Sequence, residues 1–375
     1  MEKTKLTKEQ LAILVASYLK ANKIAVAGFE ASKDNVLGLL DKIGKTIEID
    51  GIYTSELDWM DGDNLPAGKT IEEYFEDFIA PEDYVKESGL GNVNGPEIGA
   101  RPVRYSYTQG RKKWKVKKYF DDLERAFSTE AGAINALEGI TERLESSYRM
   151  WRDDAKRKLL GTLASKAKQI MTTTTTFAVK TAYTTGTAVR KDTNGSAYAI
   201  VFKDIPSSNT LDWAGAVGAG YLAPVNLVEK VDVPTDDVTG EAFIIAVKEA
   251  VRKMKFKNHE NLNGALVKPT PEANRRLVID TSLMPELEVK TIAGAFHADR
   301  LAMPATMSEV EDFGTGNSDV LAILLDERGA KLHNSYNATR TQELADDDAI
   351  LYVKHTEDTA FISANTFVHV FLKKA

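Results

Sequence analysis

Cysteine is absent from this 375-residue sequence. Its absence excludes a disulfide framework, a thiolate metal site and a cysteine nucleophile. No run of eighteen or more apolar residues occurs, so the sequence predicts no membrane-spanning helix and no membrane association. The first twenty residues mix lysines with an apolar face and lack the apolar core of a signal peptide, which predicts synthesis inside the cell.

Motifs that carry enzyme chemistry are also missing. The sequence has no Gly-x-Ser-x-Gly elbow, and no glycine fingerprint follows a strand pattern. The five histidines are scattered, without the i, i+4 pair that many metal sites use. The three carboxylates at 346–348 lack the spacing of a calcium loop, which favours a solvated turn. We therefore predict no catalytic residue, no cofactor and no metal site.

One segment resembles the end of a phosphate-binding loop, at Gly68-Lys69-Thr70. That motif needs a glycine five residues before Gly68, where this chain has Asp63. A carboxylate at that position repels phosphate, so a turn is the better interpretation. A nucleotide-using enzyme remains an alternative that ranks last.

Charge is divided unevenly along the chain, whose net charge is −7. Acidic residues dominate from Glu56 to Glu87, and residues 101–118 contain cations with no acid among them. Such segments suit an extended loop whose basic arm lies on the acidic surface of a neighbouring subunit. We predict that inter-subunit contacts use Arg101, Arg104, Arg111, Lys112, Lys113, Lys115 and Lys117 on the basic side, and Glu72, Glu73, Glu76 and Asp77 on the acidic side.

Two other interpretations of these segments stay open. Both segments could simply be solvated charged faces. The basic segment could also bind nucleic acid, because Tyr105, Tyr107 and Trp114 interleave with its cations. The acidic balance of the whole chain ranks this below a subunit contact. Alternating apolar residues predict two strands here, with a turn at Gln109-Gly110.

The strongest periodic pattern predicts a helix over about 129–170, roughly 60 Å long at 1.5 Å per residue. Apolar residues recur every three or four positions along one stripe. The opposite face carries Arg143, Arg149, Arg152 and Lys156, so we expect the helix to lie along one side of an extended molecule. Gly139 and Gly161 are two points at which the helix could bend.

The rest of the chain mixes strand and helix patterns, which makes the fold class α+β. Residues 177–233 are β-rich, and Asn194-Gly195 predicts a hairpin with a two-residue turn. A glycine-rich passage over 215–220 is expected to be a closely packed loop. The remaining patterns predict a helix at 241–256 that buries Phe243, Val247, Val251 and Met254, a helix at 287–296, and strands at 276–280, 320–325, 349–353 and 366–372.

Several local strings resemble a known family, the phi twenty-nine-like phage capsid proteins, whose fold is the Hong Kong 97-like fold. The similar strings, which occur in the same order as in that family, are Asp41-Lys-Ile-Gly44, Leu65-Pro-Ala-Gly-Lys-Thr-Ile-Glu-Glu73, Leu277-Val-Ile-Asp280, Pro285-Glu-Leu-Glu-Val289 and Ala293-Gly-Ala-Phe296. The resemblance covers nearly the whole chain from about residue 36.

The resemblance implies a division of the chain into the parts of that fold. Its parts are an N-terminal arm at 1–65, an extended loop at 66–120, a peripheral domain with a spine helix at 121–175, an axial domain at 176–345, and C-terminal strands at 346–375 that return to the peripheral domain. Residues 177–227 have no counterpart in the family and are expected to be an inserted β region.

The function implied by the resemblance is that of a major capsid protein. Such a protein assembles with itself into hexamers and pentamers of an icosahedral shell. The shell encloses double-stranded DNA without sequence-specific binding, and portal and scaffolding proteins are the expected partners. The expected location is the virion, after synthesis in the host cytoplasm. An encapsulin-like compartment, which has the same fold but packages protein, remains an alternative.

Overall fold

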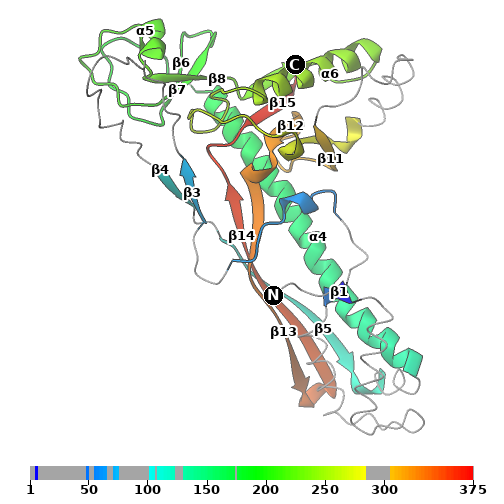
Figure 1. Cartoon of the computed structure of the whole chain (residues 1–375). Helices are drawn as coiled ribbons and strands as arrows, with labels where there is room; N and C mark the ends of the chain where they lie inside the picture. The colour runs from blue at the N-terminus through cyan, green and yellow to red at the C-terminus, as the bar shows by residue number, and fades with distance from the viewer. Residues whose placement is uncertain are drawn as a thin grey trace, which may run out of the picture. The chain divides into compact units, whose positions relative to one another are not determined.

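Separate stretches of the sequence come together in two units. Unit 1 consists of Met1–Lys69, Thr108–Lys156 and Leu332–Ala360, and unit 2 of Thr70–Tyr107, Arg157–Lys331 and Phe361–Ala375. The computed structural model in Figure 1 describes residues 55–65, 71–75, 101–105, 108–122, 130–173, 175–283 and 305–374, together with the short parallel strands β1 (Lys5–Leu6) and β2 (Glu48–Ile49). The predicted helix at 287–296 and Gly68-Lys69-Thr70 lie outside these residues.

Unit 1 contains a three-stranded sheet in the order β13-β14-β5 (Figure 1). Its strands are β5 (Thr108–Tyr119), β13 (Ala330–Leu344) and β14 (Ala349–Ile362), and two 3-10 turns lie at Asp58–Met60 and Ala345–Asp347. β14 pairs antiparallel with β5. The three aspartates at 346–348 are exposed in the turn between β13 and β14, which confirms the solvated turn.

The predicted turn at Gln109-Gly110 is wrong. Both residues lie inside β5, and β5 does not pair with the basic strand that precedes it. Gly110 has a φ of +96°, which glycine adopts without steric cost, and the ladder with β14 shifts register next to it. The glycine therefore allows a bulge within one long strand.

The long helix is confirmed as α4 (Glu130–Met171, 42 residues). The stripe expected to be apolar is buried at Leu144, Tyr148, Ala155, Leu159 and Leu163. The charged face of α4 is not solvated throughout, because the side chains of Arg152 and Lys156 are only 11% and 2% exposed. Carboxylates from distant parts of unit 1 compensate both charges, a feature that helical periodicity does not reveal.

Unit 2 is built on a five-stranded mixed sheet in the order β11-β10-β12-β15-β9. These strands are β9 (Val228–Val231), β10 (Arg275–Asp280), β11 (Thr306–Val310), β12 (Val320–Asp326) and β15 (Val368–Lys373). All seven residues of the central β12 are buried, which explains its continuous apolar run. Short 3-10 turns lie at Glu272–Asn274, Thr281–Leu283 and Glu327–Gly329.

Helix α6 (Asp237–Met254) packs on this sheet. Asp236 caps its first turn and forms a capping box with Thr239. All four residues predicted to be buried are in the core, with Phe243 against Phe371 of β15 at a ring-centroid distance of 5.7 Å. The strand predictions at 276–280, 320–325, 349–353 and 366–372 are also confirmed.

The β-rich region forms a smaller three-stranded sheet with its own core. Its elements are β6 (Ala188–Arg190), β7 (Tyr198–Val201), β8 (Leu222–Val225) and the short helix α5 (Trp213–Gly218). The predicted hairpin exists, since β6 pairs antiparallel with β7, but seven residues connect the strands and not two. The glycine-rich passage forms α5, which Asp212 caps, and is therefore not the loop we expected.

Gly161 is a packing position of α4. A Cβ atom built at residue 161 would lie 2.1 Å from the carbonyl oxygen of Phe313. Asn317 donates its side-chain amide to the carbonyl oxygens of Gly161 and Phe313, at 3.0 and 3.1 Å. The glycine thus lets the helix lie directly against the backbone of the loop before β12. Gly139, in contrast, has no atom within 4 Å of the same built position.

We predict that these two glycines respond oppositely to alanine. Gly139→Ala should stabilise the protein by about 0.5–1 kcal/mol, the usual helix preference for alanine over glycine. Gly161→Ala should destabilise it by about 1–3 kcal/mol, because overpacking against backbone outweighs that preference. Urea unfolding followed by circular dichroism measures both. Equal stabilisation by the two substitutions would contradict the packing role of Gly161.

Candidate subunit-contact site

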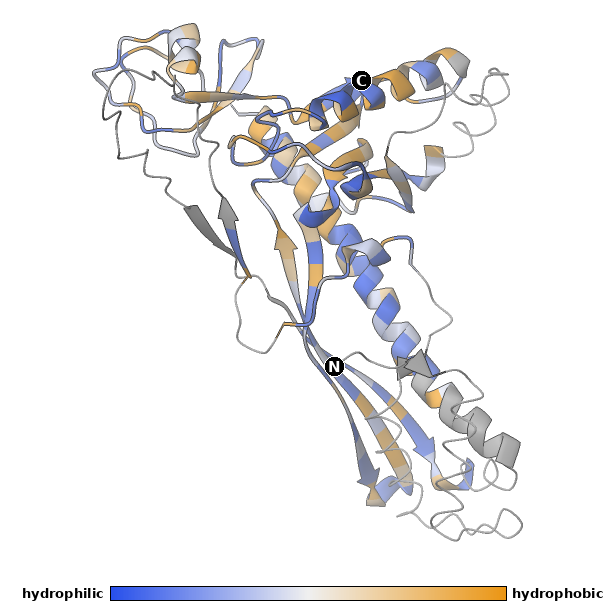
Figure 2. Ribbon diagram, viewed as in Figure 1, coloured by the Kyte–Doolittle hydropathy of each residue, from blue (hydrophilic) through white to orange (hydrophobic). Residues whose placement is uncertain are grey.

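Most of the predicted basic contact residues lie on β5, an edge strand of its sheet. The five on this strand, all exposed, are Arg111, Lys112, Lys113, Lys115 and Lys117. Successive side chains of a strand point to opposite faces. The cations at 111, 113, 115 and 117 therefore share one face, and Figure 2 shows β5 mostly in the hydrophilic colour.

The other face of β5 packs on α4. Trp114 contacts Tyr148 and Trp151 edge-on, at ring-centroid distances of 5.4 and 5.7 Å. Trp114, which the sequence left open as a base-stacking residue, is thus only half-exposed and serves the core of unit 1. This packing leaves the opposite, cationic face of the strand as the one available for a contact.

Two of the five cations have partners in their own chain. Arg111 donates to Glu357 of β14 at 2.7 Å, and Lys117 lies 2.8 Å from Asp347. The hydrogen bond to Asp347 raises the pKa of Lys117 above its ordinary value. In the described part of the chain, the intervening lysines at 112, 113 and 115 form no ion pair.

Four more of the predicted residues lie on a two-stranded antiparallel sheet of unit 2, formed by β3 (Ile71–Phe75) and β4 (Arg101–Tyr105). They are Glu72, Glu73, Arg101 and Arg104. The register sets Glu72 opposite Arg104, and Arg101 opposite the last residue of β3. Residues of the acidic and the basic segment thus stand opposite each other within one chain.

Glu73 has partners that the sequence did not indicate. Its carboxylate accepts hydrogen bonds from Ser363 Oγ at 2.8 Å and from Asn365 Nδ2 at 3.2 Å, both on buried residues. These bonds join positions about 290 residues apart in the sequence, and no local pattern reveals them. Glu76 and Asp77 lie outside the described residues.

A network of buried charged side chains connects α4 to the sheet that contains β5. Arg152 of α4 donates to Asp358 of β14 and to Asp61, each at 2.7 Å, and to the carbonyl oxygen of Leu332 at 3.0 Å. Tyr148 also donates to Asp358, at 3.1 Å. The network joins the helix, two strands and the 55–65 segment of unit 1.

Burial and pairing act in opposite directions on these groups. Burial raises the pKa of Tyr148, and it raises the pKa of Asp358 by more than the nearby Arg152 lowers it. Burial lowers the pKa of Arg152, but Tyr148, Asp61 and Asp358 together raise it by more. One oxygen of Asp358 is buried without a hydrogen-bond partner among the described residues. The carboxylate therefore depends on Arg152 to remain charged.

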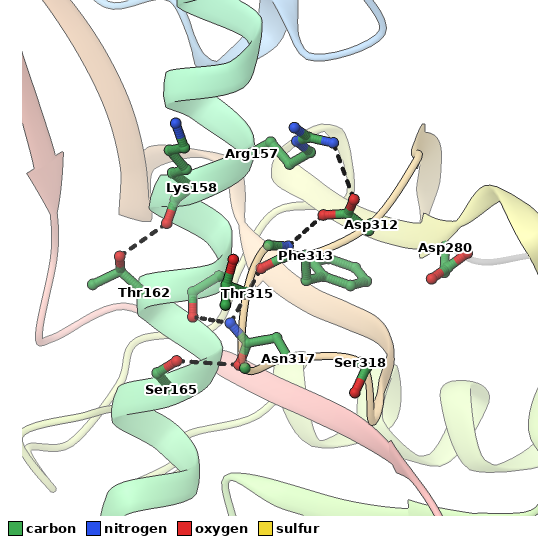
Figure 3. Close-up of a pocket in the computed structure, with 13 residues that line it drawn as sticks. Arg157, Lys158, Thr162, Ser165, Asp280, Asp312, Phe313, Thr315, Asn317 and Ser318 are labelled. Carbon is green, nitrogen blue, oxygen red and sulfur yellow. Dashed lines mark hydrogen bonds and ion pairs between the residues drawn. The ribbon is translucent and has the colours of Figure 1, made fainter.

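A hollow of about 730 Å³ in unit 2 lies between α4 and the 312–318 loop (Figure 3). Several of the polar groups that line it form ion pairs or hydrogen bonds with one another. Arg157 pairs with Asp312 at 3.2 Å, and Ser165 donates to the side-chain oxygen of Asn317 at 3.1 Å. These bonds fix the loop to the helix, and we assign the hollow no chemistry.

A second buried charged cluster surrounds His369 of β15, which is fully buried. Its Nε2 lies 3.1 Å from Glu229 of β9, and its Nδ1 lies 3.1 Å from Glu260. Burial lowers the pKa of His369, but the two carboxylates raise it by more, and the net direction is upward. The imidazole thus links the two paired strands β15 and β9.

No group of three or more potential metal ligands occurs among the described residues. The helices of the described residues are not long and apolar enough to cross a membrane.

The fold of the chain is similar to that of proteins in solved phage structures. One is the capsid structure of Staphylococcus phage Andhra, with a TM-score of 0.54 at 12% identity over 85% of this chain and 84% of that chain. Another is the structure of head fiber and inner core protein gp22 of native bacteriophage P68, with a TM-score of 0.53 at 12% identity over 88% and 87%. The fold is the Hong Kong 97-like fold of tailed-phage capsid proteins, as the sequence predicted.

The family follows from a match to the sequence model of the Phi29-like phage major capsid protein over residues 9–372. The chain belongs to this family, and it is a structural subunit of a virion. A search among curated proteins gives no match. Neither the encapsulin nor the nucleotide-enzyme alternative gains support from these comparisons.

We predict that Arg152→Met destabilises the protein by about 3–5 kcal/mol, because it leaves a buried carboxylate without its counter-charge. Adding Asp358→Asn should recover part of this loss. Arg157→Met is the matched control on the same helix. Its partners Glu311 and Asp312 are exposed, so it should cost less than about 1 kcal/mol. Chemical denaturation of the unassembled chain measures all three variants, and equal losses for Arg152→Met and Arg157→Met would contradict the network's role.

We also predict a dependence of stability on pH that His369 causes. Its pKa is raised on folding, so its contribution is complete below the ordinary value of about 6.5 and is lost as pH rises through the folded value. The free energy of unfolding should fall with rising pH in that window, by at most about 1.4 kcal/mol per pH unit. His369→Gln should remove this slope in thermal melts between pH 6 and pH 9. An unchanged slope in the variant would assign it to other groups.

Proposed function

We propose that this chain assembles with copies of itself into hexamers and pentamers, which close into an icosahedral shell around double-stranded DNA. The observation that carries the proposal is the match of the family model to residues 9–372, nearly the whole chain. The shell encloses DNA without reading its sequence, and the acidic net charge of −7 is consistent with that. Scaffolding and portal proteins act as further partners, and the chain is made in the host cytoplasm before it enters the virion.

The parts of the fold have distinct roles in this proposal. Residues 1–65 are the N-terminal arm, residues 66–120 the extended loop, and residues 121–175 the peripheral domain with its spine helix α4. Residues 176–345 form the axial domain, and residues 346–375 return to the peripheral domain. The extended loop reaches across a neighbouring subunit and sets its register.

The lysines of β5 make the contact with that neighbour. Lys113 and Lys115 lie on the cationic face, are exposed and have no ion pair among the described residues, whereas the cations at 111 and 117 on that face are already paired. A free cationic strand edge suits an acidic surface on the neighbour. Complementary charges of this kind give specificity and register more than affinity.

Edge-strand lysines have a second possible role, since they also oppose unwanted strand addition. The two roles differ in what charge reversal does. Glutamate prevents strand addition as well as lysine does, but it repels an acidic neighbour. Charge reversal therefore separates a contact from mere protection of the edge.

We predict that the double variant Lys113→Glu, Lys115→Glu folds but does not form shells. Sedimentation and electron microscopy measure assembly, and circular dichroism measures folding. The matched control reverses two exposed lysines of the β-rich region, Lys191 and Lys203, and therefore changes the net charge equally.

Normal shells from the β5 variant would exclude the contact and leave edge protection as the role of these lysines. Loss of shells in both variants would attribute the effect to net charge alone. The contents of wild-type shells test the encapsulin alternative, because protein cargo in place of nucleic acid would favour it.

A further inference from the structure

The turn that follows helix α6 presents an exposed aromatic residue among positive charges. Phe256 lies two residues beyond the end of α6 at Met254, and it is 63% exposed. Its neighbours in the sequence include three exposed cations, Arg252, Lys255 and Lys257. In the described part of the chain, Arg252 and Lys255 form no ion pair. We call these three cations and Phe256 the basic end of α6.

The backbone of this turn is fixed, although its aromatic residue is exposed. The N–H group of Phe256 donates to the carbonyl oxygen of Lys253 at 3.0 Å. The side-chain amide of Asn258 donates to the carbonyl oxygens of Lys253 and Phe256, each at 3.0 Å. Asn258 is itself held by two backbone hydrogen bonds with Val267. The turn thus keeps Phe256 outside the core, and exposed aromatic residues of this kind are enriched at protein interfaces.

The first turns of α6 have the opposite charge around a second exposed apolar residue. Val238 is 77% exposed, more than any other large apolar residue in the described part of the chain. The exposed acids Asp236 and Glu241 flank it, and Ala242 beside them is also exposed. The carboxylate of Asp236 caps the helix, whereas Glu241 forms no ion pair within the described ranges. We call these four residues the acidic end of α6.

The two ends cannot meet within one copy of the chain. In Figure 1, α6 is a single unbroken helix near the C-terminus. Val238 and Met254 are sixteen residues apart, which is about 24 Å at 1.5 Å per residue. The core of unit 2 takes a different face of α6, with Phe243, Val247 and Val251 buried. Two copies of the chain can therefore bring a basic and an acidic end together, whereas one copy cannot.

We infer that the basic end of α6 in one copy docks on the acidic end of α6 in the next copy around a ring. This inference rests on the proposed function, in which copies of the chain form hexamers and pentamers and α6 belongs to the axial domain. Neighbours in such a ring meet through two unlike surfaces, one on each side of the subunit. The two ends of α6 are unlike in charge, and each contains an exposed apolar residue.

Both the apolar and the charged residues gain partners in this contact. Phe256 packs on Val238 and Ala242 of the next copy, which removes apolar surface from water. Lys255 then lies beside Glu241 of that copy, and complementary charges of this kind set orientation more than affinity. Two basic ends, or two acidic ends, would instead repel each other. Each subunit makes the contact twice, once through each end, so a ring of five or six copies closes.

The absence of native cysteine makes a cross-linking test direct. Val238→Cys and Lys257→Cys are placed in the same chain, which keeps Phe256, Lys255 and Glu241. A short bismaleimide reagent then joins cysteines that lie close together in assembled particles, and the length of α6 prevents a link within one chain. We expect denaturing electrophoresis to show a ladder of covalently linked copies that ends at five and six.

The controls separate a ring contact from other pairings. Each single-cysteine variant should give no cross-link, and neither should Val179→Cys with Lys257→Cys, since the exposed Val179 is not on α6. Dimers from a single variant, or a ladder that stops at dimers in the double variant, would overturn the ring contact. Verified shells without cross-links would overturn it too and leave the proposed function intact, whereas a wild-type chain that forms no shells would remove both.

Charge exchange tests the same contact without cysteines. Glu241→Lys and Lys255→Glu should each reduce the yield of shells, because each brings like charges together. The two substitutions in one chain restore the wild-type net charge and should restore the yield. Circular dichroism checks that all three variants fold. Normal yields from both single variants, or no recovery in the double variant, would overturn the pairing of the two ends.

Discussion

The ion pair between Arg152 and Asp358 is the interaction on which unit 1 depends. A fully buried carboxylate is unfavourable unless a positive charge and hydrogen bonds compensate it. Here the guanidinium comes from α4, the carboxylate comes from β14, and the same guanidinium reaches Asp61 and the backbone of β13 at Leu332. One side chain thereby fixes the helix, two strands and the 55–65 segment in a single arrangement.

This anchoring has a consequence for β5. The strand lies at the edge of the sheet, and its inward face is held by Trp114 against Tyr148, which itself donates to Asp358. A backbone held this firmly fixes the spacing of the outward lysines along the strand. Fixed spacing favours a defined register between subunits.

The sequence predicted the elements whose signals are local. The stripe of α4, the buried face of α6 and the apolar run of β12 follow from periodicity alone, and the structure confirms each. The role of Gly161 was not predictable, because its reason is the carbonyl oxygen of Phe313, some 150 residues away in the sequence. The burial of Arg152 and Lys156 was not predictable either, because their partners Asp61 and Asp358 are also distant in the sequence. A charged helix face is normally solvated.

The predicted contact residues also combine features that the sequence reveals with features that it does not. The sequence predicted that the cations lie on a strand, but it did not predict that Glu73 bonds to Ser363 and Asn365. Charge alone therefore overestimates the number of residues free for a neighbour, and the tertiary structure reduces the set.

Shell proteins repeat each contact many times, which changes what a single contact must contribute. Interfaces that are individually small can be decisive when every subunit makes them around a closed surface. The contact that we propose for the lysines of β5 is of this kind. Ionic strength weakens a contact between exposed charges, whereas the buried pair of Arg152 and Asp358 within each subunit is screened much less. High salt should therefore separate the subunits before it unfolds them.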